Sequence, residues 1–289
     1  MVVVHLVARL RAPRRDLGTF DAARWLWVRL EALFPGLVAA AIMPNHPHVL
    51  AEVADPDEAR RRLARTCGQL QRQLRADDLF EPLPPPELVE PSKIPRVARY
   101  IELNPSRAGL VMHPAEWLWS TFRDVAGTTV WPALDLQHHA RRTKARRRDA
   151  WLEYVERDDR VPDRRALGAP VPGERRLPAF GLETIAAAVL AATRARPSAM
   201  RARGPIRELF IAAAIDQGIT SPSLLATVCA CSPRTIQLAR HRPVVESQLM
   251  PIRRCLGDER LLRAALGLVR DSFASLEHTD SPNLVDRRR

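Results

Sequence analysis

The stretch "LVAAAIMPNHPHVLAEV" at residues 37–53 decides the fold of the first part of this chain. Its two apolar arms flank Pro44-Asn45, a pair typical of turns, so the stretch predicts an antiparallel β-hairpin. The second arm begins with His46 and His48. Because side chains alternate between the faces of a strand, both imidazoles project to the same side, where together they can hold one divalent cation. The alternative is a pair of surface histidines beside a turn.

The segments around this hairpin predict an α+β domain with helices over a small antiparallel sheet. Residues 2–10 read as a strand, and residues 20–34 and 55–75 have the apolar spacing of helices. A third helix is expected to begin at Ser92, its N-cap, and to stop at Asn104, because a residue before proline is pushed out of the α region. The proline-rich residues 79–91 favour an edge strand or a loop.

The third helix carries side chains suited to phosphodiester chemistry. Arg96, Tyr100 and Asn104 are spaced by four and so share a face. A phenol has a pKa near 10, so its attack on a phosphate needs a metal ion or cationic neighbours such as Arg96, Arg99 or Arg107. The alternatives are an ordinary tyrosine on an amphipathic helix and an asparagine that caps it.

Three motifs in order resemble one protein family. They are "MPNHPHVL" at residues 43–50, "RYIELNPSRAGLV" at 99–111 and "HPAEWLWSTF" at 113–122. Together they resemble the REP-associated tyrosine transposases, relatives of the single-tyrosine insertion-sequence transposases in the HUH endonuclease superfamily. The resemblance covers residues 1–125.

This resemblance implies a ferredoxin-like antiparallel sheet with packed helices and a metal-dependent nuclease that acts on single-stranded or hairpin DNA. It implies that His46, His48 and Asn104 hold Mg²⁺ or Mn²⁺ and that Tyr100 is the nucleophile. In the family the tyrosine forms a 5′-phosphotyrosyl enzyme and leaves a free 3′-hydroxyl that can rejoin another strand. The covalent bond conserves the phosphodiester energy, and the chain has no nucleotide-binding "GxxxxGK[ST]" loop.

Two features depart from the family pattern. Pro47 stands between the histidines, where relatives usually have a bulky apolar residue, and it removes a backbone donor that only an edge or strand start can spare. The segment "PLPPPELVEP" at residues 82–91 replaces a more regular strand. Either change is compatible with a nuclease that has lost activity or gained another use.

The remaining chain predicts a linker and a second, all-α domain. Residues 126–181 combine a basic helix with a segment rich in proline, glycine and charge, and residues 277–289 form a polar tail expected to be disordered. Within residues 182–276, helices opening at Ser221-Pro222 and Ser232-Pro233 follow a helix-turn-helix plan, loosely like the DNA-binding domain of replication initiators. The last helix offers candidate contacts to duplex DNA: Arg234, Thr235, Gln237, Arg240 and Arg242. A plain helical bundle with a basic surface is the alternative.

The positive net charge of the chain is consistent with a polyanionic partner such as DNA. The 289 residues carry a formal net charge of +12, although a general arginine bias would give the same sign. Basic helices around residues 60–75 and 141–148 are expected either to follow a DNA backbone or to form solvated faces. The four cysteines form no Cys-x-x-Cys pair and read as buried thiols. The absence of a signal peptide or membrane span favours a cytoplasmic, nucleoid-associated protein without a membrane partner.

Three functions remain open from the sequence. The first is the strand-transferring nuclease, and the second is a domesticated, catalytically inactive DNA-binding regulator of the same fold. A replication initiator with the same tyrosine chemistry is the third. The sequence also leaves open whether the site is built in one chain or shared across a homodimer.

Overall fold

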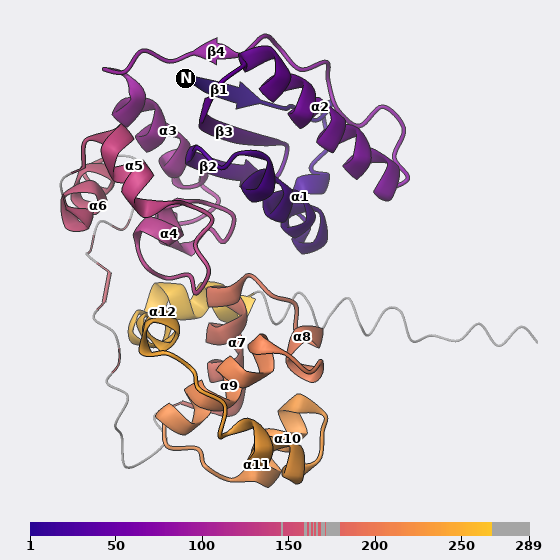
Figure 1. Cartoon of the computed structure of the whole chain (residues 1–289), viewed down its shortest axis with the longest axis vertical. Helices are drawn as coiled ribbons and strands as arrows, with labels where there is room; N and C mark the ends of the chain where they lie inside the picture. The colour runs from indigo at the N-terminus through magenta and orange to yellow at the C-terminus, as the bar shows by residue number, and fades with distance from the viewer. Residues whose placement is uncertain are drawn as a thin grey trace, which may run out of the picture. The chain divides into compact units, whose positions relative to one another are not determined.

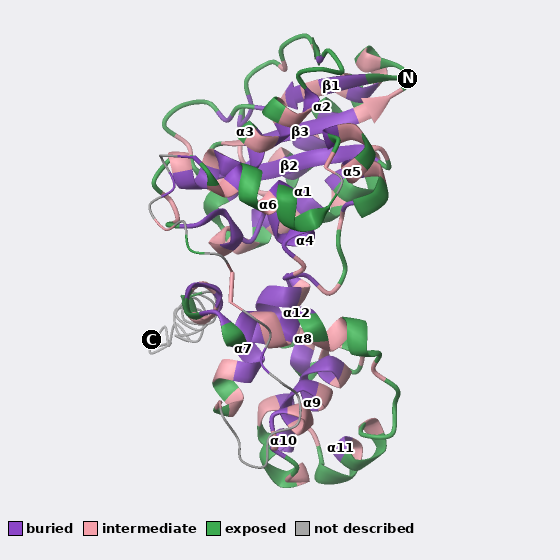
Figure 2. Cartoon of the chain, turned by 90° about the vertical axis from the view of Figure 1, so that its left-hand side faces the viewer, coloured by how far each residue is buried: buried purple, intermediate pink, exposed green. Residues whose placement is uncertain are grey.

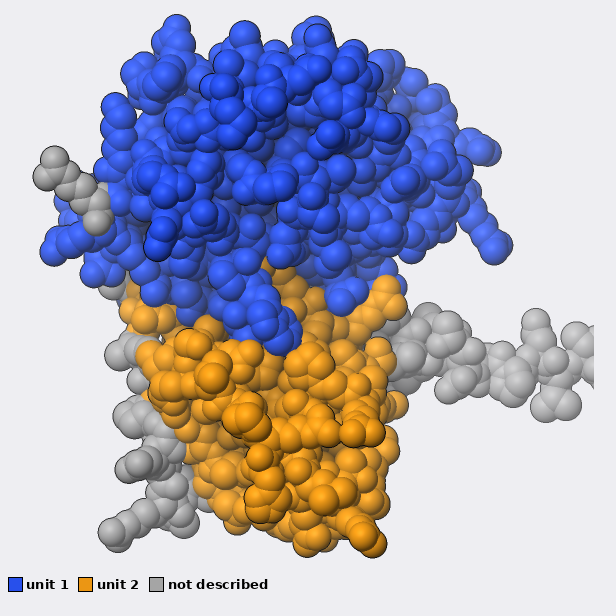
Figure 3. All heavy atoms as spheres, in the orientation of Figure 1, with its two compact units in different colours: residues 1–166 blue, residues 167–289 orange. Residues whose placement is uncertain are grey.

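The computed structural model describes residues 1–145, 147–158, 161, 163, 165, 167–168, 171 and 180–267. The chain divides into two compact units, Met1–Ala166 and Leu167–Arg289 (Figure 3). The first unit extends past residue 125 and includes the part of the segment 126–181 in which a basic helix was expected. Most of the predicted proline- and glycine-rich linker, and the whole predicted tail at residues 277–289, lie outside the described residues.

The first unit has a mixed α+β fold built on a four-stranded antiparallel sheet in the order β2-β3-β1-β4 (Figure 1). The element order β1-α1-β2-β3-α2-β4 with this strand order is the ferredoxin-like arrangement that the family resemblance implies. The strands are β1 (Val2–Val7), β2 (Leu37–Met43), β3 (His46–Val53) and β4 (Glu87–Leu88).

Helices cover both faces of the sheet. Thr19 caps α1 by accepting from the Ala22 amide, and Asp55 caps α2 by accepting from two first-turn amides. These two helices pack on one face, and α3 and α5 pack on the other, with α6 against α3 (Figures 1 and 2). The helices are α1 (Phe20–Leu33), α2 (Pro56–Gln73), α3 (Ile94–Arg107), α4 (Phe122–Val125), α5 (Leu136–Thr143) and α6 (Arg148–Glu156), with short 3-10 turns η1 (Asp16–Gly18) and η2 (Pro114–Glu116).

The predicted hairpin is confirmed, with Pro47 inside the sheet. Pro47 is the second residue of β3, a central strand, and pairs with Ile42 of β2. The Ile42 amide donates to the Trp119 carbonyl at 2.9 Å, and its carbonyl accepts from Trp117 Nε1 at 2.9 Å. Ile42 therefore needs no bond from Pro47. On the other side, β1 ends at Val7, one residue before the level of Pro47, so the missing donor falls at the end of the ladder.

Two predictions about helix ends are wrong. Lys93, not Ser92, precedes α3, with no capping side chain, and Pro95 in the first turn starts the helix instead. The helix does not stop at Asn104 but runs through Pro105 to Arg107. Asn104 keeps a helical role because its carbonyl accepts from the Ala108 amide at 2.9 Å. The bias of a residue before proline away from α is a preference, which the packing of α3 on the sheet overrides here.

The basic segment predicted as one helix is two helices. Lys144 adopts a left-handed conformation, with φ of 57°, and so ends α5 before α6 begins. His139 Nδ1 donates to the Val38 carbonyl at 2.8 Å, which fixes α5 on β2. Arg142 of α5 forms an ion pair with Glu52 of β3. Part of the basic charge of this segment therefore serves internal contacts.

The second unit is helical. The helix α7 packs on α9 and α12, and α10 packs on α11. Gly218, with φ of 87°, turns the chain after α9, and Ala230, with φ of 47°, turns it between α10 and α11. The helices are α7 (Leu182–Thr193), α8 (Ser198–Arg201), α9 (Pro205–Asp216), α10 (Pro222–Cys229), α11 (Pro233–Ala239) and α12 (Glu246–Gly257), and residues 259–267 are also helical.

The structure also bears on the expectations about membrane-spanning helices and cysteines. Among the described residues, none of the helices has the length and apolar character needed to cross a lipid bilayer. The four cysteines are free thiols; three are buried, and Cys231 is partly exposed.

Candidate active site

The return arm of the hairpin places both histidines on the face of the sheet that α3 covers. His46 is partly exposed and His48 is buried at 2% exposure. Their Nε2 atoms lie 2.9 Å apart. His46 Nδ1 lies 2.7 Å from Asn45 Oδ1, which can only accept, so that nitrogen carries the proton and Nε2 carries the lone pair. His46 thus offers a metal-binding atom toward His48.

The helix α3 brings Asn104 and Tyr100 to the same place. The Asn104 amide lies 2.7 Å from His48 Nε2. The Tyr100 ring stands edge-on to the His48 imidazole, with centroids 5.7 Å apart, and the tyrosine is 43% exposed. Tyr100 is thus beside the histidines and open to solvent. All four side chains come from one chain.

Burial keeps both imidazoles neutral. Loss of hydration is the main cause that lowers the pKa of His46 to about 4 and that of His48 to about 2, and the Arg9 guanidinium adds to both effects. The neighbouring imidazoles contribute further to the lowering at His48. A neutral imidazole is the form that binds a metal ion, so the pair is ready to coordinate at neutral pH.

The donor set fits a hard divalent cation. Two cis ligands of an octahedral ion with bonds of about 2.0–2.1 Å are about 2.9 Å apart, the spacing found between the two Nε2 atoms. Rotation of the Asn104 amide presents its oxygen to the same point. In the described part of the chain, no three His, Cys, Asp or Glu side chains are grouped to hold a metal. A cation here would need the amide oxygen as third ligand and water or phosphate oxygens for the rest.

The predicted arginines of α3 have different surroundings. Arg96 is exposed. Arg107 lies with its guanidinium carbon 5.7 Å from the centroid of the Tyr100 ring and forms an ion pair with Asp158. Arg99 also approaches Asp158, at 3.8 Å, and stacks on Tyr154 instead of Tyr100. Of the three, Arg107 is therefore the cation placed over the Tyr100 ring.

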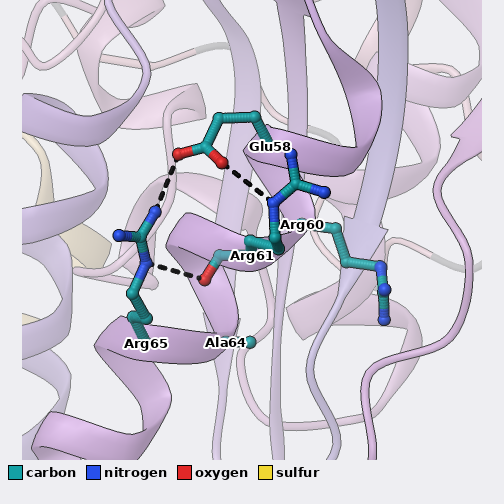
Figure 4. A pocket seen from close by; sticks show the side chains of 5 residues that line it. All are labelled: Glu58, Arg60, Arg61, Ala64 and Arg65. Atoms are coloured by element: carbon teal, nitrogen blue, oxygen red, sulfur yellow. Dashed lines mark hydrogen bonds and ion pairs between the residues drawn. The ribbon is translucent and has the colours of Figure 1, made fainter.

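The basic face of α2 is partly neutralised. Glu58 accepts from Arg61, Arg62 and Arg65 at 2.9, 3.1 and 2.7 Å. Glu58, Arg61 and Arg65 line a hollow that Arg60 and Ala64 complete (Figure 4). Hydrogen bonds from Arg61 and Arg62 lower the pKa of Glu58 to about 2. Arg60 turns away from the cluster and donates to the Leu83 carbonyl at 3.2 Å.

The candidate DNA-binding residues of the second unit also differ in their surroundings. Ile236 of α11 is fully buried, whereas Arg234, Gln237 and Arg240 are exposed. The Thr235 hydroxyl bonds the capping hydroxyl of Ser232 at 3.0 Å. Arg242 forms an ion pair with Glu208 of α9. Two of the five predicted residues, Arg234 and Gln237, are thus exposed on α11, and a third, Arg240, is exposed at its C-cap.

Two residues beside the histidines were missed from the sequence. His5 Nε2 lies 3.0 Å from His48 Nδ1, and His5 Nδ1 lies 3.1 Å from Glu87 Oε2. A lone histidine in the apolar run "VVVHLV" was the available signal. Its meaning depends on strand register, which places His5 opposite Glu87 and diagonal to His48.

Comparisons with known proteins found one distant similarity among solved structures. No protein-family model and no curated protein matches the chain. A solved structure described as the REP-associated tyrosine transposase bound to a REP hairpin aligns with 46% of this chain and 83% of that chain, with 19% sequence identity and a TM-score of 0.39. At these values the similarity indicates a distant structural relationship and nothing finer.

Proposed function

We propose that the first unit is a single-tyrosine DNA nuclease and strand transferase that acts on single-stranded or hairpin DNA. In this proposal Tyr100 is the nucleophile, and His46, His48 and Asn104 hold Mg²⁺ or Mn²⁺. The observation that carries the proposal is the convergence of an exposed phenol with two neutral imidazoles and an amide from separate segments of one chain. The formal net charge of +12 supports a nucleic-acid partner.

Each side chain has a separate part in the proposed reaction. When bound, the cation polarises the phosphate and stabilises charge on its oxygens. Burial keeps His46 and His48 neutral, and α3 holds the Tyr100 ring against His48. The Arg107 guanidinium, 5.7 Å from the centroid of the Tyr100 ring, places a cation beside the proposed nucleophile.

The covalent step balances without another reactant. The Tyr100 oxygen loses its proton to solvent and attacks phosphorus, so that an oxygen–phosphorus bond forms. The bond from phosphorus to the 3′-oxygen breaks, and that oxygen takes a proton to become a free 3′-hydroxyl. A second 3′-hydroxyl reverses the step and joins the strands, which keeps the phosphodiester energy in the phosphotyrosine.

End-labelled DNA tests this proposal. The full chain is incubated with Mn²⁺ and hairpins that have randomised single-stranded flanks, labelled at the 3′ end because that piece would carry the 5′-phosphotyrosine. We expect a labelled band at the mass of the protein plus DNA on a denaturing gel. With 5′-labelled DNA, we expect only a shorter free strand.

The two tyrosines of the chain provide a matched control. Tyr100→Phe should abolish the adduct, whereas Tyr154→Phe should keep it, because Tyr154 contacts Trp151 and Arg99 instead of the histidines. An adduct that persists in Tyr100→Phe would refute the assigned nucleophile. An unaltered protein that binds the hairpins but forms no adduct would support the inactive regulator.

For the second unit we propose binding to duplex DNA through α11. The buried Ile236 anchors this short helix, and the exposed Arg234, Gln237 and Arg240 offer donors to bases and phosphates. The turns at Gly218 and Ala230 join α9, α10 and α11 in a helix-turn-helix order.

A further inference from the structure

Two hydrogen bonds connect an exposed carboxylate to His48. Glu87 Oε2 lies 3.1 Å from His5 Nδ1, and His5 Nε2 lies 3.0 Å from His48 Nδ1. The two imidazoles stack nearly parallel, with an interplanar angle of 15°. The strands β4, β1 and β3 each contribute one member, so sheet register fixes the order Glu87, His5, His48.

The chemistry of the three groups determines which atom donates in each of these two hydrogen bonds. A carboxylate only accepts, so His5 Nδ1 carries the proton toward Glu87, and a neutral His5 then has a lone pair on Nε2. That lone pair accepts from His48 Nδ1. The proton of His48 is thus held on Nδ1. Its Nε2 accepts from the Asn104 amide at 2.7 Å and faces the Nε2 lone pair of His46 at 2.9 Å, a contact without a proton that a cation bound between the two nitrogens would make favourable.

Without Glu87, the direction of the hydrogen bond between His5 and His48 would be undetermined. His5 alone can either donate to or accept from His48, and a donating His5 would put the His48 proton on Nε2, where it would block the proposed cation site. Asn45 sets the tautomer of His46 in the same way, through Oδ1 at 2.7 Å from Nδ1. Both histidines of the site therefore have an acceptor on the side away from the proposed cation.

His5 is not placed as a further ligand for the same cation. Its Nε2 approaches the Nδ1 side of the His48 ring, whereas His46 and Asn104 approach the Nε2 side. One imidazole cannot present both nitrogens to one ion. The contact of His5 is thus with the ligand and not with the cation.

We propose that His5 and Glu87 are positioning residues that lock His48 in the tautomer with its proton on Nδ1, which prepares Nε2 to bind a divalent cation. The role in cation binding rests on the proposed function, but the tautomer is a property of the metal-free protein. Partners of this kind typically change metal affinity by about 10- to 100-fold when they are removed.

The tautomer can be measured directly. The full chain is labelled with ¹⁵N-histidine, and long-range proton–nitrogen correlations are recorded without metal, with His48 assigned by the loss of its signals in His48→Gln. We expect His48 protonated on Nδ1 in the unaltered protein. In His5→Phe we expect a large share of the Nε2-protonated form. His48 protonated on Nε2 in the unaltered protein would overturn the proposal.

Conservative variants separate positioning from a structural role. The amide oxygen of His5→Gln falls near the place of Nε2 and still accepts, so it should retain the Nδ1 tautomer better than His5→Phe. Glu87→Gln should raise the Nε2-protonated share. Glu90→Gln is the matched control, because Glu90 is on the same segment but pairs with Lys93, and it should change nothing.

Cation binding provides the second readout. Mn²⁺ affinity, followed by the electron paramagnetic resonance of the free ion, should fall about 10-fold or more in His5→Phe and less in Glu87→Gln. Equal affinity in His5→Phe and the unaltered protein would refute the positioning role. If the tautomer responds as expected but Tyr100 forms no adduct, the positioning role stands and the nuclease proposal fails. If Tyr100 forms the adduct but the His48 tautomer does not respond to His5→Phe, the nuclease proposal stands and the positioning role of His5 fails.

Discussion

The side-chain amide of Asn104 lies 2.7 Å from His48 Nε2, although 56 residues separate the two in sequence. Asn104 is an interior residue of α3, which continues through Pro105 to Arg107. If the helix had stopped at Asn104, as the following proline suggested, the side chain would have been free to cap the helix end. The uninterrupted helix instead directs Asn104 and Tyr100, one turn apart, toward the same imidazole.

Substitutions at Asn104 should change Mn²⁺ affinity in opposite directions. Asn104→Ala removes the third donor and should weaken binding about 10-fold or more, without loss of helix, because alanine has the highest helix propensity. Asn104→Asp supplies a carboxylate to a hard cation and should strengthen binding. Titration of Mn²⁺ followed by electron paramagnetic resonance measures both. Equal affinities in the two variants would remove Asn104 from the cation site.

The buried Glu102 should make the first unit less stable as the pH rises. Burial is the main cause that raises the pKa of Glu102 from 4.5 to about 8, although Trp151 and Thr121 bond its carboxyl group. Between about pH 4.5 and 8 the folded state keeps a proton that the unfolded state has lost, so the free energy of unfolding falls as pH rises. The loss is fully present above the folded pKa.

Glu102→Gln tests this effect because glutamine imitates the protonated acid. Its oxygen can accept from Trp151 Nε1, and its NH₂ group can donate to the Thr121 hydroxyl. We expect the variant to gain stability relative to the unaltered protein from pH 5 to pH 8, by an amount on the order of a few kcal/mol. Urea unfolding followed by tryptophan fluorescence reports on this unit, because all six tryptophans lie between residues 25 and 151. If the free energies of unfolding of Glu102→Gln and the unaltered protein changed with pH in parallel, the raised pKa of Glu102 would be contradicted.

The hairpin and the cluster around it differ in how far the sequence could predict them. Pro44-Asn45 between two apolar arms is a local signal, and so is the common side of His46 and His48, so both follow from neighbouring residues. The course of α3 through Pro105 depends on packing against the sheet, which overrides a local preference. The link from Glu87 through His5 to His48 requires the register of three strands, and residues 5 and 87 are 82 positions apart. No local pattern specifies that pairing.

Two glycines of the first unit should respond to alanine in opposite ways. A Cβ at Gly36 would lie 2.5 Å from the Glu52 carbonyl oxygen, a backbone atom that cannot move alone. Gly36→Ala should therefore lower the free energy of unfolding by about 1–3 kcal/mol. Gly68 lies inside α2, and its nearest neighbour would be a flexible Arg72 nitrogen at 3.7 Å. Gly68→Ala should raise stability by up to about 1 kcal/mol, and the same urea experiment compares them. An unchanged Gly36→Ala would show that β2 and β3 are not held so closely.

Salt dependence should separate the arginines of the second unit. If α11 contacts duplex DNA, Arg234→Ala should weaken binding and reduce the slope of log affinity against log salt by about 1, the value expected for one lost phosphate contact. Arg242→Ala should have a smaller effect, because Glu208 already pairs with that guanidinium. Arg254→Ala is the control, since α12 lies at the other end of the unit from α11 (Figures 1 and 2). Fluorescence anisotropy of a labelled duplex, with Tyr100→Phe in every protein to prevent cleavage, measures each slope. Equal losses of DNA affinity in all three variants would indicate nonspecific electrostatic attraction to the second unit. They would contradict the proposal that α11 contacts the DNA.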